Sequence, residues 1–176
     1  MNEKILQSEQ IFKGRIVDLS VHNVELPDGS QAKREIIKHP GAVALVALDD
    51  DSNVLLIRQF RLGAGKVLIE LPAGTLEPDE PAETCAIREL REETGYRPGS
   101  LERIGGWFVA PGYTTEYIHL FIARDLNEDP MEGDEDEFIE LFRVPFAQAI
   151  EMVHNGEIEN STGVAGLLLA AAHLQF

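Results

Sequence analysis

The segment Pro81–Thr94 constrains this 176-residue chain more than any other stretch. Good helix formers fill it, a proline stands at its first turn, and Gly95 follows it directly, so it predicts one helix. On that helix Glu89, Glu92 and Glu93 follow the i, i+3, i+4 spacing, which places three carboxylates on one face. Each like-charge pair costs a few tenths of a kcal/mol, roughly, so the crowding calls for an explanation.

Two interpretations of this acidic face are open. Arg88 and Arg91 lie among the acids, and on an arbitrary helix a solvated face with local ion pairs is the ordinary outcome. A hard divalent cation is the alternative, because it takes several oxygen ligands and keeps waters for substrate phosphates. The helix follows a strand and the loop Pro72-Ala73-Gly74, so its face can project into a cleft, and the carbonyl of Ala73 is a candidate neutral ligand.

The surrounding residues resemble the Nudix box, a signature that spans 23 residues here. Its fixed positions are filled by Gly74, Glu80, Arg88-Glu89-Leu90-Arg91-Glu92-Glu93, Gly95 and Tyr96. Only Tyr96 departs from the pattern, since a bulky aliphatic residue is more usual there. The resemblance implies an α/β (α+β) fold, the Nudix α/β/α sandwich with a mixed sheet. It also implies hydrolysis of a nucleoside diphosphate linked to another group.

The resemblance assigns roles within the box. It implies that Glu89, Glu92 and Glu93 are metal ligands and that Arg88, counted with Glu92 among the catalytic residues, orients carboxylates by hydrogen bonds. Gly74 would permit a tight loop conformation. We expect Glu80 to be a structural contact rather than a ligand. Mg²⁺ is the expected cofactor, and Mn²⁺ or another divalent cation is expected to substitute for it.

Further segments resemble the ADP-ribose pyrophosphatase branch of the family. Pro111 lies sixteen residues after Gly95, the spacing that marks this branch. The similar segments are Arg34 to Ile37, His39 to Val43, Ile57 to Arg61 and Glu70 to Gly74. This resemblance implies a small N-terminal antiparallel β domain, residues 1–39, exchanged between the subunits of a homodimer, and a hydrolase domain at residues 40–176.

The substrate of this branch would need cations for its phosphates and apolar surfaces for its base. Arg58 and Arg61 are candidates for the phosphates, because a guanidinium binds phosphate oxygens in a bidentate manner; an ordinary surface role is the alternative. The remaining candidates for substrate contacts are Arg34, Glu35, Pro111 and Gly112. For the aromatic residues Phe12, Trp107 and Tyr113 we favour core packing over stacking on a base.

A water-activating base is expected outside the box. In related ADP-ribose hydrolases a glutamate of a late acidic loop has this role, and here five of the six residues 132–137 are acidic. Alignment on Ile139 favours Glu135. Glu137 is the second choice, as base or additional metal contact, and Glu116 the third. Most acids of this loop are expected to be solvated, and His39, His119 and His154 are expected to be structural.

The remaining pattern predicts β-structure around the box and two helices after it. Residues 12–38 alternate in polarity about Pro27-Asp28-Gly29 and predict a hairpin or small antiparallel sheet. Residues 42–48 and 54–57 predict a second hairpin, with the first run a central strand because it is apolar on both faces. Further strands are predicted at 66–71, 101–109, 117–123 and 138–144, and helices at 145–155 and 161–175.

Composition excludes some partners. The net charge of -16 disfavours nucleic acid and anionic membranes as partners, although a bound divalent cation can reverse the local field for a phosphorylated small molecule. The single cysteine, Cys85, excludes an internal disulfide and is expected to be a small buried or half-buried residue rather than a reactive thiol. No apolar signal core or membrane-length segment is present, so a cytoplasmic protein is expected.

The sequence therefore predicts an enzyme that hydrolyses ADP-ribose to AMP and ribose 5-phosphate. The same chemistry on another nucleoside diphosphate sugar, such as ADP-glucose or GDP-mannose, is a close alternative. A non-catalytic sensor that binds nucleotide sugars is an alternative of another class, disfavoured because binding alone does not require every acid of the box.

Overall fold

The computed structural model describes residues 1–133 and 137–176, which form two compact units. The first comprises Met1–Gly41 and Trp107–Tyr117, and the second comprises Ala42–Gly106 and Ile118–Phe176. Among the described residues, no helix is both long and apolar enough to cross a membrane.

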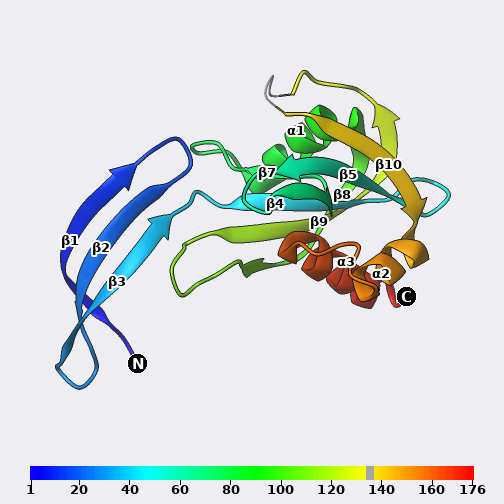
Figure 1. The fold of residues 1–176 in the computed structure, drawn as a ribbon. Coiled ribbons are helices and arrows are strands. Elements are labelled where there is room, and N and C mark those ends of the chain that lie inside the picture. The colour runs from blue at the N-terminus through cyan, green and yellow to red at the C-terminus, as the bar shows by residue number, and fades with distance from the viewer. Residues whose placement is uncertain (134–136) are drawn as a thin grey trace. The chain divides into compact units, whose positions relative to one another are not determined.

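The first unit contains a three-stranded antiparallel sheet in the order β1-β2-β3 (Figure 1). Its strands are β1 (Lys4–Lys13), β2 (Asp18–Glu25) and β3 (Gln31–Lys38). The β2–β3 turn holds Gly29 at φ 83°, a left-handed conformation that glycine adopts without strain. The predicted β-structure is confirmed, but most of β1 was missed. All ten of its residues are exposed, so it lacks the one-sided burial that makes a strand recognisable.

The loop at residues 109–116 is hydrogen-bonded to the end of β3 within this unit. The Ile37 N–H donates to the Tyr113 carbonyl at 2.8 Å, and the Thr115 N–H donates to the Ile37 carbonyl at 3.0 Å. Both the Tyr113 and Thr114 N–H groups donate to the carbonyl of Ala110. The turn at residues 110–114 is thereby defined by backbone hydrogen bonds.

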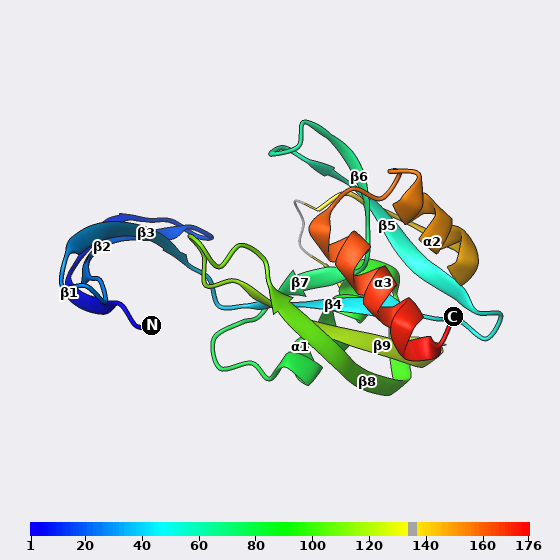
Figure 2. The ribbon, with the colours of Figure 1, turned by 90° about the horizontal axis from the view of Figure 1, so that it is seen from below.

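The second unit contains two sheets and three helices (Figures 1 and 2). The four-stranded sheet has the order β7-β4-β9-β8 and the three-stranded sheet the order β10-β5-β6. The strands are β4 (Ala42–Ala47), β5 (Asn53–Arg61), β6 (Lys66–Glu70), β7 (Ala73–Thr75), β8 (Tyr96–Phe108), β9 (Tyr117–Glu128) and β10 (Ile139–Pro145). The helices are α1 (Ala82–Thr94), α2 (Phe146–His154) and α3 (Ser161–Leu174).

Strand β4 is the centre of this unit. All six of its residues are buried, and it pairs in parallel with β9 and antiparallel with β7. Helices α1 and α3 lie on opposite sides of it (Figure 1). Val43 and Leu45 pack with Leu90 of α1, whereas Gly166 of α3 approaches Leu71 and Leu120 so closely that a β carbon there would clash. The predicted mixed sheet between helices is confirmed.

The predicted hairpin of residues 42–48 and 54–57 is wrong. Its two strands, β4 and β5, belong to different sheets, and the single bridge Leu48–Val54 joins them. The chain does turn at Asp49, whose Oδ1 accepts hydrogen bonds from the N–H groups of Asp51 and Asn53. The local turn was therefore predicted correctly, but strand pairing depends on residues far away in the sequence.

Candidate active site

Helix α1 carries the box acids and begins and ends as the sequence predicts. It runs from Ala82 to Thr94, and Gly95 follows in the left-handed region at φ 78°, with its N–H donating to the Arg91 carbonyl. Cys85 and Leu90 are buried in the core of the second unit, which confirms the prediction for the cysteine.

Arg88 hydrogen-bonds three acids of the box. Its Nε and Nη2 donate to the two carboxylate oxygens of Glu80, both at 2.9 Å. Its Nη1 donates to Glu89 at 2.6 Å and to Glu92 at 2.9 Å, and Nη2 also reaches the carbonyl of Thr75 at 3.2 Å. One guanidinium thus ties the loop before the helix to two of its acids.

The loop ahead of the helix shapes the positions of the other carboxylates. A β carbon on Gly74 would stand 1.9 Å from Cδ of Glu89, so glycine alone leaves room for this side chain. The N–H of Ala73 donates to Oε2 of Glu93 at 2.9 Å. Two neighbouring residues of β7 therefore hold two acids of α1 against the edge of the central sheet.

Burial makes these carboxylates hard to ionise. It raises the pKa of Glu89 from its ordinary value of 4.5 to about 7. Burial likewise raises the pKa of Glu93, with further contributions from the charges of Glu89 and Glu137. Glu80 behaves oppositely, because its hydrogen bonds with Arg88 hold its pKa at about 2. The negative charge of Glu80 is therefore compensated by Arg88, whereas the surrounding positive charge does not offset the burial of Glu89 and Glu93.

This shortage of positive charge fits a divalent cation. Carboxylate oxygens are the ligands of a hard ion, and a nearby cation favours the ionised form of a buried acid. Among residues 1–133 and 137–176, no three acidic, histidine or cysteine side chains stand together in a ligand arrangement. Arg88 instead occupies an oxygen of Glu89 and one of Glu92. The residues that fit the ion best are Glu89 and Glu93, with Glu92 within reach on the same helix.

The acidic loop and strand β5 bring further charges to this place. The charge of Glu137 raises the pKa of both Glu89 and Glu93, which puts this second choice for the base within electrostatic range of the box. Glu135, the first choice, lies outside the described residues. Arg61 hydrogen-bonds Glu70, and its pKa is raised by that pair and by the charges of Glu93 and Glu137 against the effect of its own burial.

Arg58 has different partners from Arg61, although both lie on β5. Its Nη1 donates to Glu140 at 2.8 Å, and its guanidinium carbon lies 3.9 Å from the centre of the Phe142 ring. Both partners come from β10, where Glu140 is directly paired with Arg58. Arg58 and Arg61 therefore have separate surroundings, although the sequence treats them alike.

The other predicted substrate contacts belong to the first unit. Arg34 forms two hydrogen bonds with Glu3, at 2.6 and 3.0 Å, and Glu35 is exposed. Pro111 and Gly112 are exposed in the turn at residues 110–114. The third choice for the base, Glu116, is half-buried in the same unit. Their predicted roles stay predictions.

Core packing was the wrong interpretation for two of the three aromatic candidates. Phe12 and Tyr113 are each 57% exposed, whereas Trp107 is half-buried. Strand β1, KILQSEQIFK, does not alternate apolar and polar residues, so its pattern does not assign Phe12 to a buried face.

Glu70 is a site residue that the sequence did not single out. It is 9% exposed and binds Arg61 through one carboxylate oxygen. An acid that ends the apolar run Val67 to Ile69 was the available signal, since a buried acid needs a partner.

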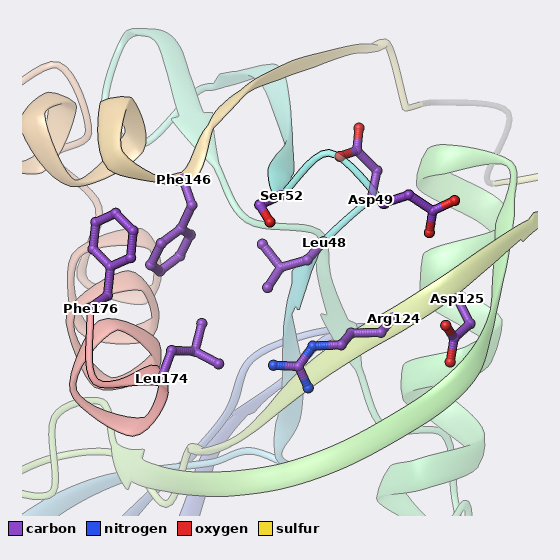
Figure 3. Close-up of a pocket in the computed structure, with 9 residues that line it drawn as sticks. Leu48, Asp49, Ser52, Arg124, Asp125, Phe146, Leu174 and Phe176 are labelled. Atoms are coloured by element: carbon purple, nitrogen blue, oxygen red, sulfur yellow. The ribbon is translucent and has the colours of Figure 1, made fainter.

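The cavity of about 370 Å³ shown in Figure 3 is separate from the box. Its walls include Leu48, Phe146 and Phe176, with Arg124 extending across it. Gly74 pairs with Val43 near the start of β4, whereas the cavity lies past the end of that strand. The six residue-to-residue steps from Val43 to Asp49 span about 20 Å in extended form.

Comparisons with known proteins agree with this arrangement. A model of the NUDIX domain matches residues 38–163, and one described as the nucleoside diphosphate sugar hydrolase N-terminal domain matches residues 3–37. An ADP-ribose pyrophosphatase of Bacillus subtilis (strain 168) is 43% identical over 160 residues, 90% of this chain and 86% of that protein.

Two further relatives carry different names. The methanol dehydrogenase activator of Bacillus methanolicus is 39% identical over 98% of this chain and 92% of its own length. A GDP-mannose pyrophosphatase of Salmonella paratyphi B (strain ATCC BAA-1250 / SPB7) is 38% identical over 99% of this chain and 95% of its own. The crystal structure of an ADP compounds hydrolase shares the fold, with a TM-score of 0.88 and 24% identity over 99% of this chain and 95% of that one. The matched domain and the box of α1 show that this chain belongs to the NUDIX family and is a Nudix pyrophosphohydrolase.

Proposed function

We propose that the protein hydrolyses the diphosphate bond of ADP-ribose, giving AMP and ribose 5-phosphate, with Mg²⁺ as its cofactor. The observation that carries the proposal is the pair of buried acids, Glu89 in the space that Gly74 leaves and Glu93 on the Ala73 N–H. Buried carboxylates with raised pKa values call for a cation, and a diphosphate brings oxygens that share it. The relative named ADP-ribose pyrophosphatase supports the choice of substrate.

The reaction adds water across the phosphorus–oxygen–phosphorus bridge. One new phosphorus–oxygen bond forms, the bridging bond breaks, and one proton leaves the attacking water. Bound Mg²⁺ would neutralise charge on the phosphate oxygens and lower the pKa of a coordinated water. Glu89, Glu92 and Glu93 would hold the ion, assisted by the Ala73 carbonyl.

The chain's own side chains would bind, orient and deprotonate. Arg88 keeps Glu89 and Glu92 in place by hydrogen bonds, and Arg61 offers a guanidinium to phosphate oxygens. Glu135 is proposed as the acceptor of the water proton, with Glu137 as the second choice. The charge of Glu137 raises the pKa of both Glu89 and Glu93, which supports a base in this loop.

A panel of substrates tests the proposal. ADP-ribose, ADP-glucose and GDP-mannose are each incubated with Mg²⁺ or with EDTA, and the products are separated by chromatography. We expect the fastest cleavage with ADP-ribose, and none in EDTA. Faster cleavage of GDP-mannose would favour the function named for the Salmonella relative. Binding of ADP-ribose without metal-dependent cleavage would favour a sensor and contradict the enzyme.

A matched variant tests the metal assignment. Glu93→Gln keeps the size of the side chain and removes one negative charge. We expect the variant to fold and to lose nearly all turnover with Mg²⁺, while Glu77→Gln, an exposed acid of the same region, keeps it. Wild-type kcat in Glu93→Gln would refute the metal role of this residue. Repeating the assay with Mn²⁺ tests whether a second divalent cation substitutes.

We also propose that two copies form a homodimer through the N-terminal β domain, residues 1–39. Strand β1 exposes four large apolar side chains, more than a solvated edge strand needs: Ile5, Leu6, Ile11 and Phe12. Light scattering after gel filtration gives the mass of the particle. We expect twice the mass of the 19.5 kDa chain, and a shift toward monomer when Ile11 and Phe12 are both changed to aspartate.

A further inference from the structure

One face of β5 runs from the core to the carboxylates of the box. Alternate residues of a strand share a face, so Leu55, Ile57, Gln59 and Arg61 lie on the same side. Leu55 belongs to the cluster that packs against α1, and Ile57 and Gln59 are also buried. The face is therefore apolar beneath the helix and becomes polar at its far end, where Arg61 stands.

Arg61 is held at that end by Glu70. Its Nε and Nη2 both donate to Oε2 of Glu70, at 3.0 and 2.7 Å. The side chain of Glu70 is 12% exposed and that of Arg61 41%, so the acid is the fixed member of the pair. A buried carboxylate that has lost its water depends on such a partner. The pair uses Nε and Nη2, which leaves Nη1 out of it.

The guanidinium lies within electrostatic range of two acids of the proposed metal site and its loop. Burial opposes its charge, but Glu70, Glu93 and Glu137 together raise the pKa of Arg61. The strand register agrees with this, because Ile139 is paired with Gln59. Glu137 precedes Ile139 by two residues and Arg61 follows Gln59 by two, so both lie just past the same end of the β5–β10 ladder.

The same short segment that carries Glu70 also places two box acids. Three residues after Glu70, the N–H of Ala73 binds Glu93, and the next residue, Gly74, leaves the space that Glu89 fills. Residues 70–74 thus contact the Arg61 guanidinium and the carboxylates of Glu89 and Glu93. A displacement of Glu70 would move the guanidinium relative to these two carboxylates.

We propose that Glu70 is a positioning residue of the active centre, which holds the Arg61 guanidinium beside Glu93 and Glu137 for contact with the diphosphate of the substrate. The proposal rests on the proposed function in one respect, that the ligand is a diphosphate. Glu70 itself acts only through Arg61. Without the Glu70 carboxylate, the Arg61 guanidinium would have no fixed position. Binding of the diphosphate would then have to order this side chain.

A double-mutant cycle with Glu70→Gln and Arg61→Met tests this dependence. Binding of ADP is measured by calorimetry with Mg²⁺ present, and kcat and KM are measured for the best substrate of the panel. Glu70→Gln should weaken ADP binding by about 10- to 100-fold, the range of one charge-assisted hydrogen bond, and raise KM more than it lowers kcat. The double variant should be no worse than Arg61→Met alone.

The matched control is Glu159→Gln. It breaks the pair of Glu159 with Lys66, which lies on the same strand as Glu70 but at its exposed end, and should leave ADP binding and kinetics unchanged. If Glu70→Gln does not fold, Glu70→Asp replaces it, because it keeps the charge and withdraws it by one methylene group.

The outcomes separate the two proposals. Additive losses in the cycle, or wild-type binding of ADP in the Glu70 variants, would overturn the positioning role, as would failure of ADP to bind the wild-type protein. Wild-type protein that binds ADP but cleaves no member of the panel would refute the proposed function alone. Non-additive ADP binding would still support the role of Glu70 in that case.

Discussion

The carboxylate of Glu89 occupies the place where a β carbon of residue 74 would stand, with Cδ only 1.9 Å from that position. Real β carbons never approach another atom this closely. The glycine is thus required by its neighbour and not by its own backbone, since its φ lies outside the left-handed region. The finding explains why a glycine loop and an acid fifteen residues later act as one unit.

Gly74→Ala should keep the fold and lose most turnover. The obstructing atoms are the far end of a flexible side chain, so Glu89 can move aside. A catalytic group displaced by about 1 Å can cost about 100-fold in rate, and we expect a loss of kcat of about that size with Mg²⁺. Gly105→Ala, where a β carbon meets nothing within 4 Å, is the control and should behave as wild type. Equal activity of the two variants would contradict the requirement.

The raised pKa values of Glu89 and Glu93 predict a stability that falls as pH rises without metal. Burial sets the pKa of Glu89 at about 7, above the value of about 4.3 for an unfolded glutamate. Between these values the folded state binds more protons, so each unit of pH costs stability. Thermal unfolding in EDTA should therefore show a lower Tm at about pH 8 than at about pH 6.

Two controls belong to that measurement. Glu89→Gln should flatten the dependence, because its amide does not titrate. Saturating Mg²⁺ should raise the Tm most at the higher pH, since the ion binds the ionised acids of the folded state alone. A Tm that rises with pH over this window in EDTA would show that other groups dominate.

How far the sequence predicted the fold differs between helices and strands. The bounds of α1 followed from Pro81 and Gly95, which act within one turn of each end. The pairing of β4 did not follow, because its parallel partner β9 begins at Tyr117, some 70 residues later along the chain. A hairpin was the natural local prediction. It is wrong because β4 pairs with β7 and β9, whereas β5 pairs with β6 and β10.

The site divides in the same manner. The acids of the box were predicted from their spacing, whereas the close approach of Gly74 to Glu89 depends on how β7 meets α1. The sequence did not indicate the contact between Glu70 and Arg61. The two residues lie on the neighbouring strands β5 and β6, and the turn between these strands does not specify which side chains meet. Contacts between elements depend on how those elements pack against one another, which the local sequence pattern does not specify.

Glu80→Gln should reduce stability more than activity. Glu80 is the partner of Arg88 through two hydrogen bonds, and its side chain is 9% exposed. Weakening one member of a buried pair leaves the other charge poorly compensated, which costs about 2 kcal/mol of unfolding free energy or more. Denaturant unfolding gives this quantity, and the exposed Glu77→Gln serves as control. An unchanged unfolding free energy would mean that Arg88 finds enough partners in Glu89 and Glu92.

The acid stability of the protein should depend on the same pair. The pKa of Glu80 is held at about 2 by Arg88, so its contribution is complete above the unfolded value of about 4.3 and disappears as pH falls toward 2. Denaturant unfolding followed by fluorescence of Trp107 should show that the unfolding free energy of wild type falls more steeply than that of Glu80→Gln between about pH 5 and about pH 2, so the stability difference between the two proteins narrows. Parallel profiles for the two proteins would contradict this.

Glu135→Gln and Glu137→Gln should separate the base from the metal ligands. A general base contributes about 100- to 10,000-fold to the rate, so the variant that lacks it should lose kcat on this scale and keep its affinity for Mn²⁺. Glu137 lies within electrostatic range of Glu89 and Glu93, so if it is a metal contact, Glu137→Gln should weaken Mn²⁺ binding as well. Glu132→Gln, in the same loop, is the control for lost charge. If both variants kept wild-type kcat, the base would have to be sought at Glu116.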